Sequence, residues 1–150
     1  MQSKRLVRFY DEHCSRTIAK ITVCEKRLTE LKEQLLNMHE QAQDMQRQLR
    51  MMWAETFGKA VAQREIYTLK RKEALILSRH EDLQLQVQET TSSMEQLTER
   101  RDDFIKLRLH YEKKKKKWEW MSDNAKKMRI RKDIHRDEKA AEECATWTIQ

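Results

Sequence analysis

The feature that most constrains this chain is a heptad repeat of apolar residues that begins at residue 14. Six consecutive heptads place apolar or small side chains at two positions with the a and d spacing of a coiled coil. The a positions are Cys14, Ile21, Leu28, Leu35, Ala42 and Leu49, and the d positions are Thr17, Cys24, Leu31, Met38, Met45 and Met52. Charged and amide residues separate them, so this segment is predicted to be a long helix with one apolar seam against another helix.

A second stripe begins at Ala62, in a register that is offset by three residues from the first. One of its two sets of positions is mostly apolar, and the other is interrupted by charge. The first set is Ala62, Leu69, Ile76, Leu83, Thr90, Leu97, Phe104, Tyr111 and Trp118, and the second is Ile66, Glu73, His80, Val87, Met94, Arg101 and Arg108. The offset fits either a stammer in one continuous rod, which would pair as a parallel dimer, or a turn between two helices.

The residues between the stripes favour the turn. Gly58 is the only glycine of the chain, there is no proline, and Gly58 lies where the register changes. In an antiparallel pair, the residue numbers of facing seam positions have a constant sum. A sum of 118 pairs Cys14 with Phe104, and a slip of one heptad, to 125, fits the pattern as well. The predicted fold is therefore all-α, a long antiparallel two-helix coiled-coil hairpin with its turn near residues 57–63.

A single hairpin domain is predicted to occupy residues 1–150. Its first helix is expected over about residues 4–56 and its second over about 63–140. Residues 141–150 are expected to form a C-terminal tail, whose threonine-rich end should fray because chain termini are seldom tied down.

The net charge of the chain is compatible with several classes of binding partner and does not distinguish among them. A net charge of +7 and a pI of about 9.4 suit nucleic acid, an anionic membrane or an acidic protein surface. No apolar run approaches the roughly 20 residues that span a bilayer, so no direct membrane insertion is expected. The three cysteines, Cys14, Cys24 and Cys144, show no CxxC spacing and fit a reducing cytosolic compartment.

Catalytic chemistry is not predicted. The sequence has no glycine-rich phosphate loop and no nucleophile elbow, and its five histidines do not fall two to a helical turn. We therefore predict no enzyme, no cofactor and no metal site. The polar seam members Glu73, His80, Arg101 and Arg108 either fix the register of the helices or leave one face open to a partner.

The strongest local feature is the basic and aromatic segment HYEKKKKKWEWMSDNAKKMRIRK, residues 110–132. Three interpretations stay open: a solvated helix surface, a contact with nucleic acid or a membrane interface, and docking to an acidic protein. Trp118 and Trp120 would suit the third, because tryptophan anchors are frequent in protein interfaces.

Four segments resemble the stalk proteins of bacterial type III secretion, the family of InvI, YscO and SctO, to which flagellar FliJ is more distantly similar. The most specific is EIYTLKRK at residues 65–72, which resembles the opening of the second helix in the InvI branch. The others follow in the same order: LTERRDDFIK at 97–106, YEKKKKKWEW at 111–120 and RDEKAAEE at 136–143. The resemblance covers most of the chain and is firmer in the second helix.

The resemblance implies a non-enzymatic stalk and coupling subunit of the export apparatus, which assists protein export. Its partners would be the central pore of the hexameric secretion ATPase, the cytosolic ring of the export gate and chaperones of exported substrates, with no nucleic acid. Its place would be the bacterial cytoplasm, at the base of the secretion machine. The ATPase contact is expected at the open end of the hairpin, and the gate contact on the outer face of the second helix near the turn. The ATPase candidates are Lys4, Arg5, Arg8, Lys113, Lys114, Lys115, Lys116, Lys117 and Trp118, and the gate candidates are Tyr67, Lys70, Arg71 and Ala74.

Two competing functions follow from the residues alone. A parallel coiled-coil tether or scaffold would use the continuous rod, and a basic coiled coil could bind nucleic acid. A hairpin and a parallel dimer differ in mass, and nucleic-acid binding would show a steep dependence on salt.

Overall fold

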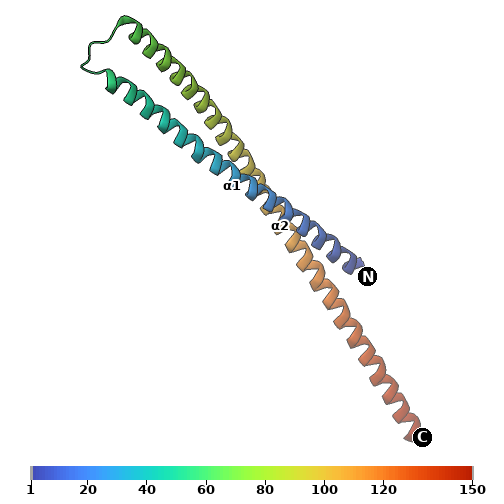
Figure 1. Cartoon of the computed structure of the whole chain (residues 1–150). Helices are drawn as coiled ribbons and strands as arrows, with labels where there is room; N and C mark the ends of the chain where they lie inside the picture. The colour runs from blue at the N-terminus through green and yellow to red at the C-terminus, as the bar shows by residue number, and fades with distance from the viewer. Residues whose placement is uncertain (1, 150) are drawn as a thin grey trace. The chain divides into compact units, whose positions relative to one another are not determined.

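The chain forms two long α-helices in the computed structural model, which describes residues 2–149 (Figure 1). Helix α1 is Gln2–Thr56 and helix α2 is Gln63–Ile149, and no strand occurs in this described range. The near absence of glycine and proline lets each helix continue unbroken, because these two residues are the strongest helix breakers. The predicted all-α hairpin is confirmed.

Helix α2 continues beyond the predicted boundary at residue 140. It includes residues 141–149, where a tail was expected, and Gln150 lies outside the described residues. The physical reason is local composition, because Ala140, Ala141, Glu142 and Glu143 all favour helix.

The turn occupies residues 57–62 and depends on Gly58. Its φ is +78°, in the left-handed region that side chains other than glycine rarely adopt. The Lys59 N–H donates to the Thr56 carbonyl at 3.3 Å, which closes the end of α1. The Ala62 carbonyl accepts from the Glu65 N–H at 2.9 Å, which opens α2. The helix does not pass through Gly58, so the continuous-rod interpretation is wrong.

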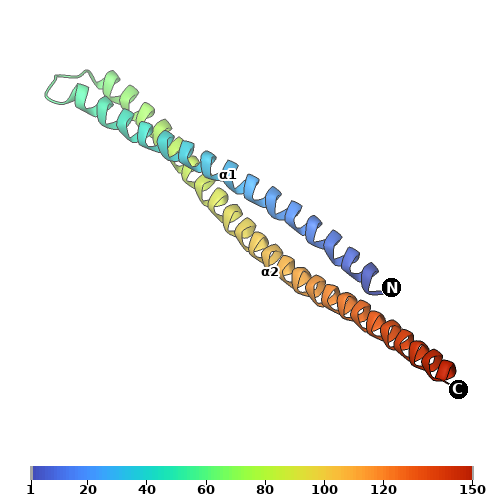
Figure 2. The same ribbon diagram turned by 90° about the horizontal axis from the view of Figure 1, so that it is seen from below.

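Contacts divide the chain into two compact units, each with its own pair of helical segments. In its described part, the first unit joins residues 2–21 of α1 to 103–149 of α2. The second unit is Thr22–Asp102 and includes the turn. Within each unit the two segments run antiparallel and side by side, as both views show (Figures 1 and 2). Within the described residues, neither helix has a stretch long and apolar enough to cross a membrane.

Burial confirms the seam that was predicted on α1. All twelve positions are buried or half-buried, while the residues between them are mostly exposed. The buried members are Cys14, Thr17, Ile21, Cys24, Leu28, Leu31 and Ala42, and the half-buried members are Leu35, Met38, Met45, Leu49 and Met52. This apolar stripe supplies the hydrophobic stabilisation of the helix pair.

The seam of α2 is confirmed from Leu69 onward and is wrong at its start. Leu83 is buried and the other predicted positions from Leu69 to Trp118 are half-buried, including the polar ones. Ala62 and Ile66 are exposed instead. Ala62 lies in the turn and Ile66 in the first turn of α2, before the two helices pack against each other.

The register of the first unit follows the slipped pairing. The Cys14 thiol donates to the Arg108 carbonyl, with 3.7 Å between sulfur and oxygen, and this pair of residue numbers sums to 122. The Lys20 ammonium lies 5.6 Å from the centre of the Phe104 ring, and that pair sums to 124. Both sums are nearer to 125 than to 118, so the pairing of Cys14 with Phe104 is wrong.

An aromatic cluster accounts for this register. The His13 and Tyr111 rings stack across the two helices with centroids 5.2 Å apart. The Tyr10 ring lies 6.2 Å from Tyr111, and Phe9 packs edge-on against His13 at 4.2 Å. Aromatic pairs contribute more stability than the area they bury would give. The slipped pairing therefore gains aromatic contacts that are not counted when only apolar heptad positions are compared.

Candidate interaction surfaces

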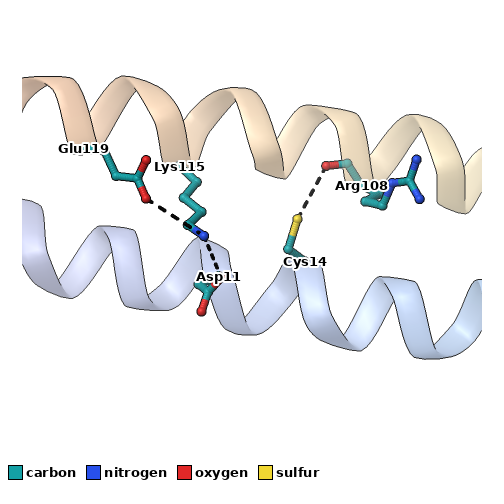
Figure 3. A network of polar contacts seen from close by, with 5 residues as sticks. All are labelled: Asp11, Cys14, Arg108, Lys115 and Glu119. Carbon is teal, nitrogen blue, oxygen red and sulfur yellow. Dashed lines mark hydrogen bonds and ion pairs between the residues drawn. The ribbon is translucent and has the colours of Figure 1, made fainter.

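A polar network joins the two helices of the first unit (Figure 3). The Lys115 ammonium on α2 donates to the Asp11 carboxylate on α1 at 2.8 Å, and lies 3.9 Å from the Glu119 carboxylate. The hydrogen bond to Asp11 raises the pKa of Lys115, and Glu119 acts in the same direction. Lys115 therefore pairs α2 with α1, unlike a lysine that extends freely into solvent.

The Cys14 thiol lies beside this network (Figure 3). Burial raises the pKa of Cys14, and the nearby Glu112 carboxylate adds to the effect. Glu112 also lies 3.6 Å from the Arg108 Nε, at ion-pair distance. Cys14 is consequently a packed thiol, as predicted from its seam position.

The polar seam members bring buried nitrogens into the helix interface. The Nε atoms of Arg101 and Arg108 and the Nε2 of His80 are buried without a hydrogen-bond partner. Arg108 Nε still lies at ion-pair distance from Glu112, whereas buried polar groups without a hydrogen bond generally destabilise an interface, so these side chains do not add to the strength of the seam. Whether they fix the register or leave one face open to a partner stays a prediction.

The structure separates the predicted ATPase-contact residues into exposed and packed side chains. All of them lie in the first unit. Lys4, Arg5, Arg8, Lys113, Lys116 and Lys117 are exposed, whereas Lys114, Lys115 and Trp118 are half-buried. Trp118 is a seam residue, while Trp120 is 65% exposed and is the more accessible tryptophan.

A groove near the N-terminal end of α1 is lined by further basic residues. Lys4 and Ser3 line it from α1, and Ser122, Ala125, Lys126 and Arg129 line it from α2. Lys126 and Arg129 were noted in the sequence as part of a basic segment but were not placed in the candidate site. The pairing slipped by one heptad, had it been chosen from the sequence, would have placed them near Lys4.

Helix α2 extends past the beginning of α1, and every residue from 123 to 148 is exposed (Figures 1 and 2). Along this extension the seam changes in character. The positions that would continue it are Ala125, Arg129, Lys132, Arg136 and Lys139. Four of these five positions are basic, so the apolar seam does not continue along the extension, although Met128, Ile130 and Ile134 are exposed elsewhere on it.

The predicted gate-contact residues share one exposed face of α2. Tyr67, Lys70, Arg71 and Ala74 follow the i, i+3, i+4, i+7 spacing of a single helix face, and all four are exposed in the second unit. The structure brings them together as one surface beside the turn.

A second feature of the turn was missed in the sequence. An apolar groove is lined by Trp53, Thr56, Phe57, Gly58, Lys59, Val61, Ile66 and Leu69. The available signal was the composition of WAETFGKAVA, residues 53–62, which has several apolar residues where a turn is usually polar.

The fold and these surfaces define a class: a small two-helix coiled-coil hairpin with exposed basic surfaces. Over residues 2–149 no group of three or more His, Cys, Asp and Glu side chains could hold a metal ion. Residues 1–145 match the model of one family, described as the Salmonella surface presentation of antigen gene type M protein. The chain belongs to this family, the InvI and SctO stalk proteins of type III secretion, as the resemblance predicted. Searches of curated proteins and of solved structures returned no match.

Proposed function

We propose that the chain is the non-enzymatic stalk of a type III secretion apparatus and couples its hexameric ATPase to its export gate in the bacterial cytoplasm. The observation that carries this proposal is the segregation of charge along a hairpin of this family. Residues 113–139 have twelve Lys and Arg against five Asp and Glu, an excess that equals the +7 of the whole chain. Residues 45–72 have seven against two, whereas residues 73–112 have five against nine.

This distribution suits contacts at two separate places on one molecule. The basic segment 113–139 lies in the first unit with Lys4, Arg5 and Arg8, and the basic segment 45–72 surrounds the turn. Basic surfaces steer toward acidic partners at long range. Exposed charge pairs are individually weak, so such a surface can shift between neighbouring acidic sites as an ATPase changes state.

In this proposal the first unit enters the ATPase pore, and the face of Tyr67, Lys70, Arg71 and Ala74 meets the gate. The chaperones of exported substrates would be further partners. The stalk contributes no chemistry of its own, and its function is to transmit position between the two contacts.

The test is stimulation of the cognate ATPase by the purified hairpin. Lys113, Lys116 and Lys117 are exchanged together for glutamate, because they are exposed, whereas Lys115 is left in place to keep its Asp11 pair. We expect stimulation to be lost and helicity by circular dichroism to be unchanged.

A matched control reverses three other exposed lysines, Lys26, Lys32 and Lys106. This control should keep most of the stimulation, because these lysines lie outside the basic segment. If the wild type and the variant with Lys113, Lys116 and Lys117 exchanged stimulate the ATPase equally, the lysine run is not part of the ATPase contact.

A further inference from the structure

The turn of the hairpin carries an apolar groove that the two helices do not fill. Phe57 is 90% exposed at its rim. Trp53 from the end of α1 and Ile66 from the start of α2 line it, and they are 39% and 40% exposed. Val61 and Leu69 line it as well and are half-buried. The groove thus presents aromatic and aliphatic surface from both helices and from the turn itself.

Helix pairing does not explain these exposed side chains. The seam of α1 ends at Met52, and the first half-buried seam residue of α2 is Leu69. Phe57 lies outside both stripes, and its large exposed ring contributes little to packing. Clustered exposed apolar side chains usually mark an interaction site, since they gain free energy only when another molecule covers them.

The charge around the groove indicates what kind of molecule covers it. Lys59 lines the groove, and the helix ends that lead into and out of it, residues 45–72, have seven Lys and Arg, including Lys70 and Arg71 of the adjacent face, against Glu55 and Glu65. A positive surface around an apolar groove attracts an acidic partner and repels a basic one. Two copies of the turn would bring like charges together, so self-association through this groove is disfavoured.

The shape of the groove favours a protein segment over a lipid surface. Trp53 and Ile66 flank it from different helices, so the apolar atoms line a hollow. An apolar hollow with a charged rim accommodates a single inserted side chain, the usual arrangement of an interface anchor.

We propose that this groove docks an acidic segment of a partner protein, which inserts one large apolar side chain against Trp53, Phe57 and Ile66. The inference goes beyond the proposed stalk function, because it assigns a surface by its chemistry and holds whichever protein supplies the segment. The face of Tyr67, Lys70, Arg71 and Ala74 is a separate surface, since none of these four residues lines the groove.

The probe is a synthetic peptide with one phenylalanine between short runs of glutamate, labelled for fluorescence anisotropy with the full chain. Two matched peptides replace the phenylalanine by serine or the glutamates by glutamine. We expect binding of the first peptide and clearly weaker binding of both others. Phe57→Ser should weaken binding about tenfold, as expected when a large apolar contact is lost. Lys59→Glu should weaken it as well, and more at low salt.

Leu36→Ser is the control, because Leu36 is an exposed apolar residue of α1 far along the chain from the turn. It should bind the peptide like the wild type, and circular dichroism should show equal helicity in all variants. Failure of the phenylalanine peptide to bind, or equal binding of all three peptides, would overturn the proposal. So would association of the wild type, but not of Phe57→Ser, with phosphatidylglycerol vesicles in place of the peptide, since the groove would then be a lipid contact. None of these outcomes involves the ATPase, so the stalk function is tested independently.

Discussion

At the scale of single residues, the five consecutive lysines of α2 are not equivalent. Lys115 donates to Asp11 at 2.8 Å, whereas Lys113, Lys116 and Lys117 are exposed. A helix turns its side chains through about 100° per residue, so a run of five must point in several directions. One of them therefore faces α1 and pairs the helices, while Lys113, Lys116 and Lys117 remain exposed.

The Lys115 pair should make stability sensitive to alkaline pH. The hydrogen bond to Asp11 raises the folded pKa of Lys115 above its unfolded value, so the pair stabilises the fold fully below that unfolded value. This contribution is lost as pH rises through the folded pKa, above the ordinary lysine value of about 10.4. The wild type should lose more stability than Lys115→Met between neutral and strongly alkaline pH in urea unfolding. Lys116→Met, at an exposed position, should behave like the wild type, and identical losses in all three proteins would contradict the assignment.

The three cysteines should differ in reactivity. Cys14 and Cys24 are buried in the seam and Cys144 is exposed, and burial raises the pKa of Cys14. Because the thiolate is the reactive form and must be accessible, iodoacetamide should modify Cys144 at least about tenfold faster than Cys14. Mass spectrometry of timed samples measures the three rates, and unfolding in urea should equalise them. Comparable rates in the folded protein would show that the seam opens readily at Cys14.

At the scale of elements, the turn depends on the backbone conformation of Gly58. An added Cβ would meet no atom within 4 Å, so crowding is not the obstacle. The obstacle is the φ of +78°, which costs a residue with a side chain about 1 kcal/mol. Gly58→Ala should therefore lower the free energy of unfolding by about that amount in urea titration. Gly58→Asn should be milder, because asparagine tolerates this region, and a stabilising Gly58→Ala would refute the argument.

The sequence was sufficient to predict two helices and the turn between them, but not the end of α2 or the fine register of the pair. The turn could be located from Gly58 and from the change of heptad phase. The backbone freedom of a glycine and the spacing of apolar residues both depend only on nearby residues in the sequence. The pairing of Cys14 depended on whether α2 slipped by one heptad, and both slips satisfied the apolar pattern. The stacking of His13 on Tyr111 and the pair of Asp11 with Lys115 favour one slip, and neither contact belongs to an apolar heptad count.

At the scale of the whole molecule, the proposed docking surfaces were only partly predictable. The basic segment was visible from composition, but the orientation of each side chain was not. Trp118 was selected as a contact and lies in the seam, while Trp120, two residues later, is exposed. Phe57 was overlooked because a turn residue without a heptad position has no assigned role until the groove around it is seen.

The hairpin should be stable as a single chain. Its seam residues on α1 face seam residues on α2 of the same molecule, so folding covers this apolar stripe within one chain, and the extension of α2 carries basic residues where the seam would continue. The thermal midpoint should consequently be independent of protein concentration, because only associating proteins gain stability by mass action. Leu31→Ala truncates a buried seam residue and should lower the free energy of unfolding by about 2 kcal/mol. The resulting decrease of the thermal midpoint should be the same at every protein concentration. Calorimetry over a wide concentration range, with the mass measured by light scattering, is the measurement. A midpoint that rises with concentration, together with a dimeric mass, would show that the helices pair between chains and would refute the self-contained hairpin.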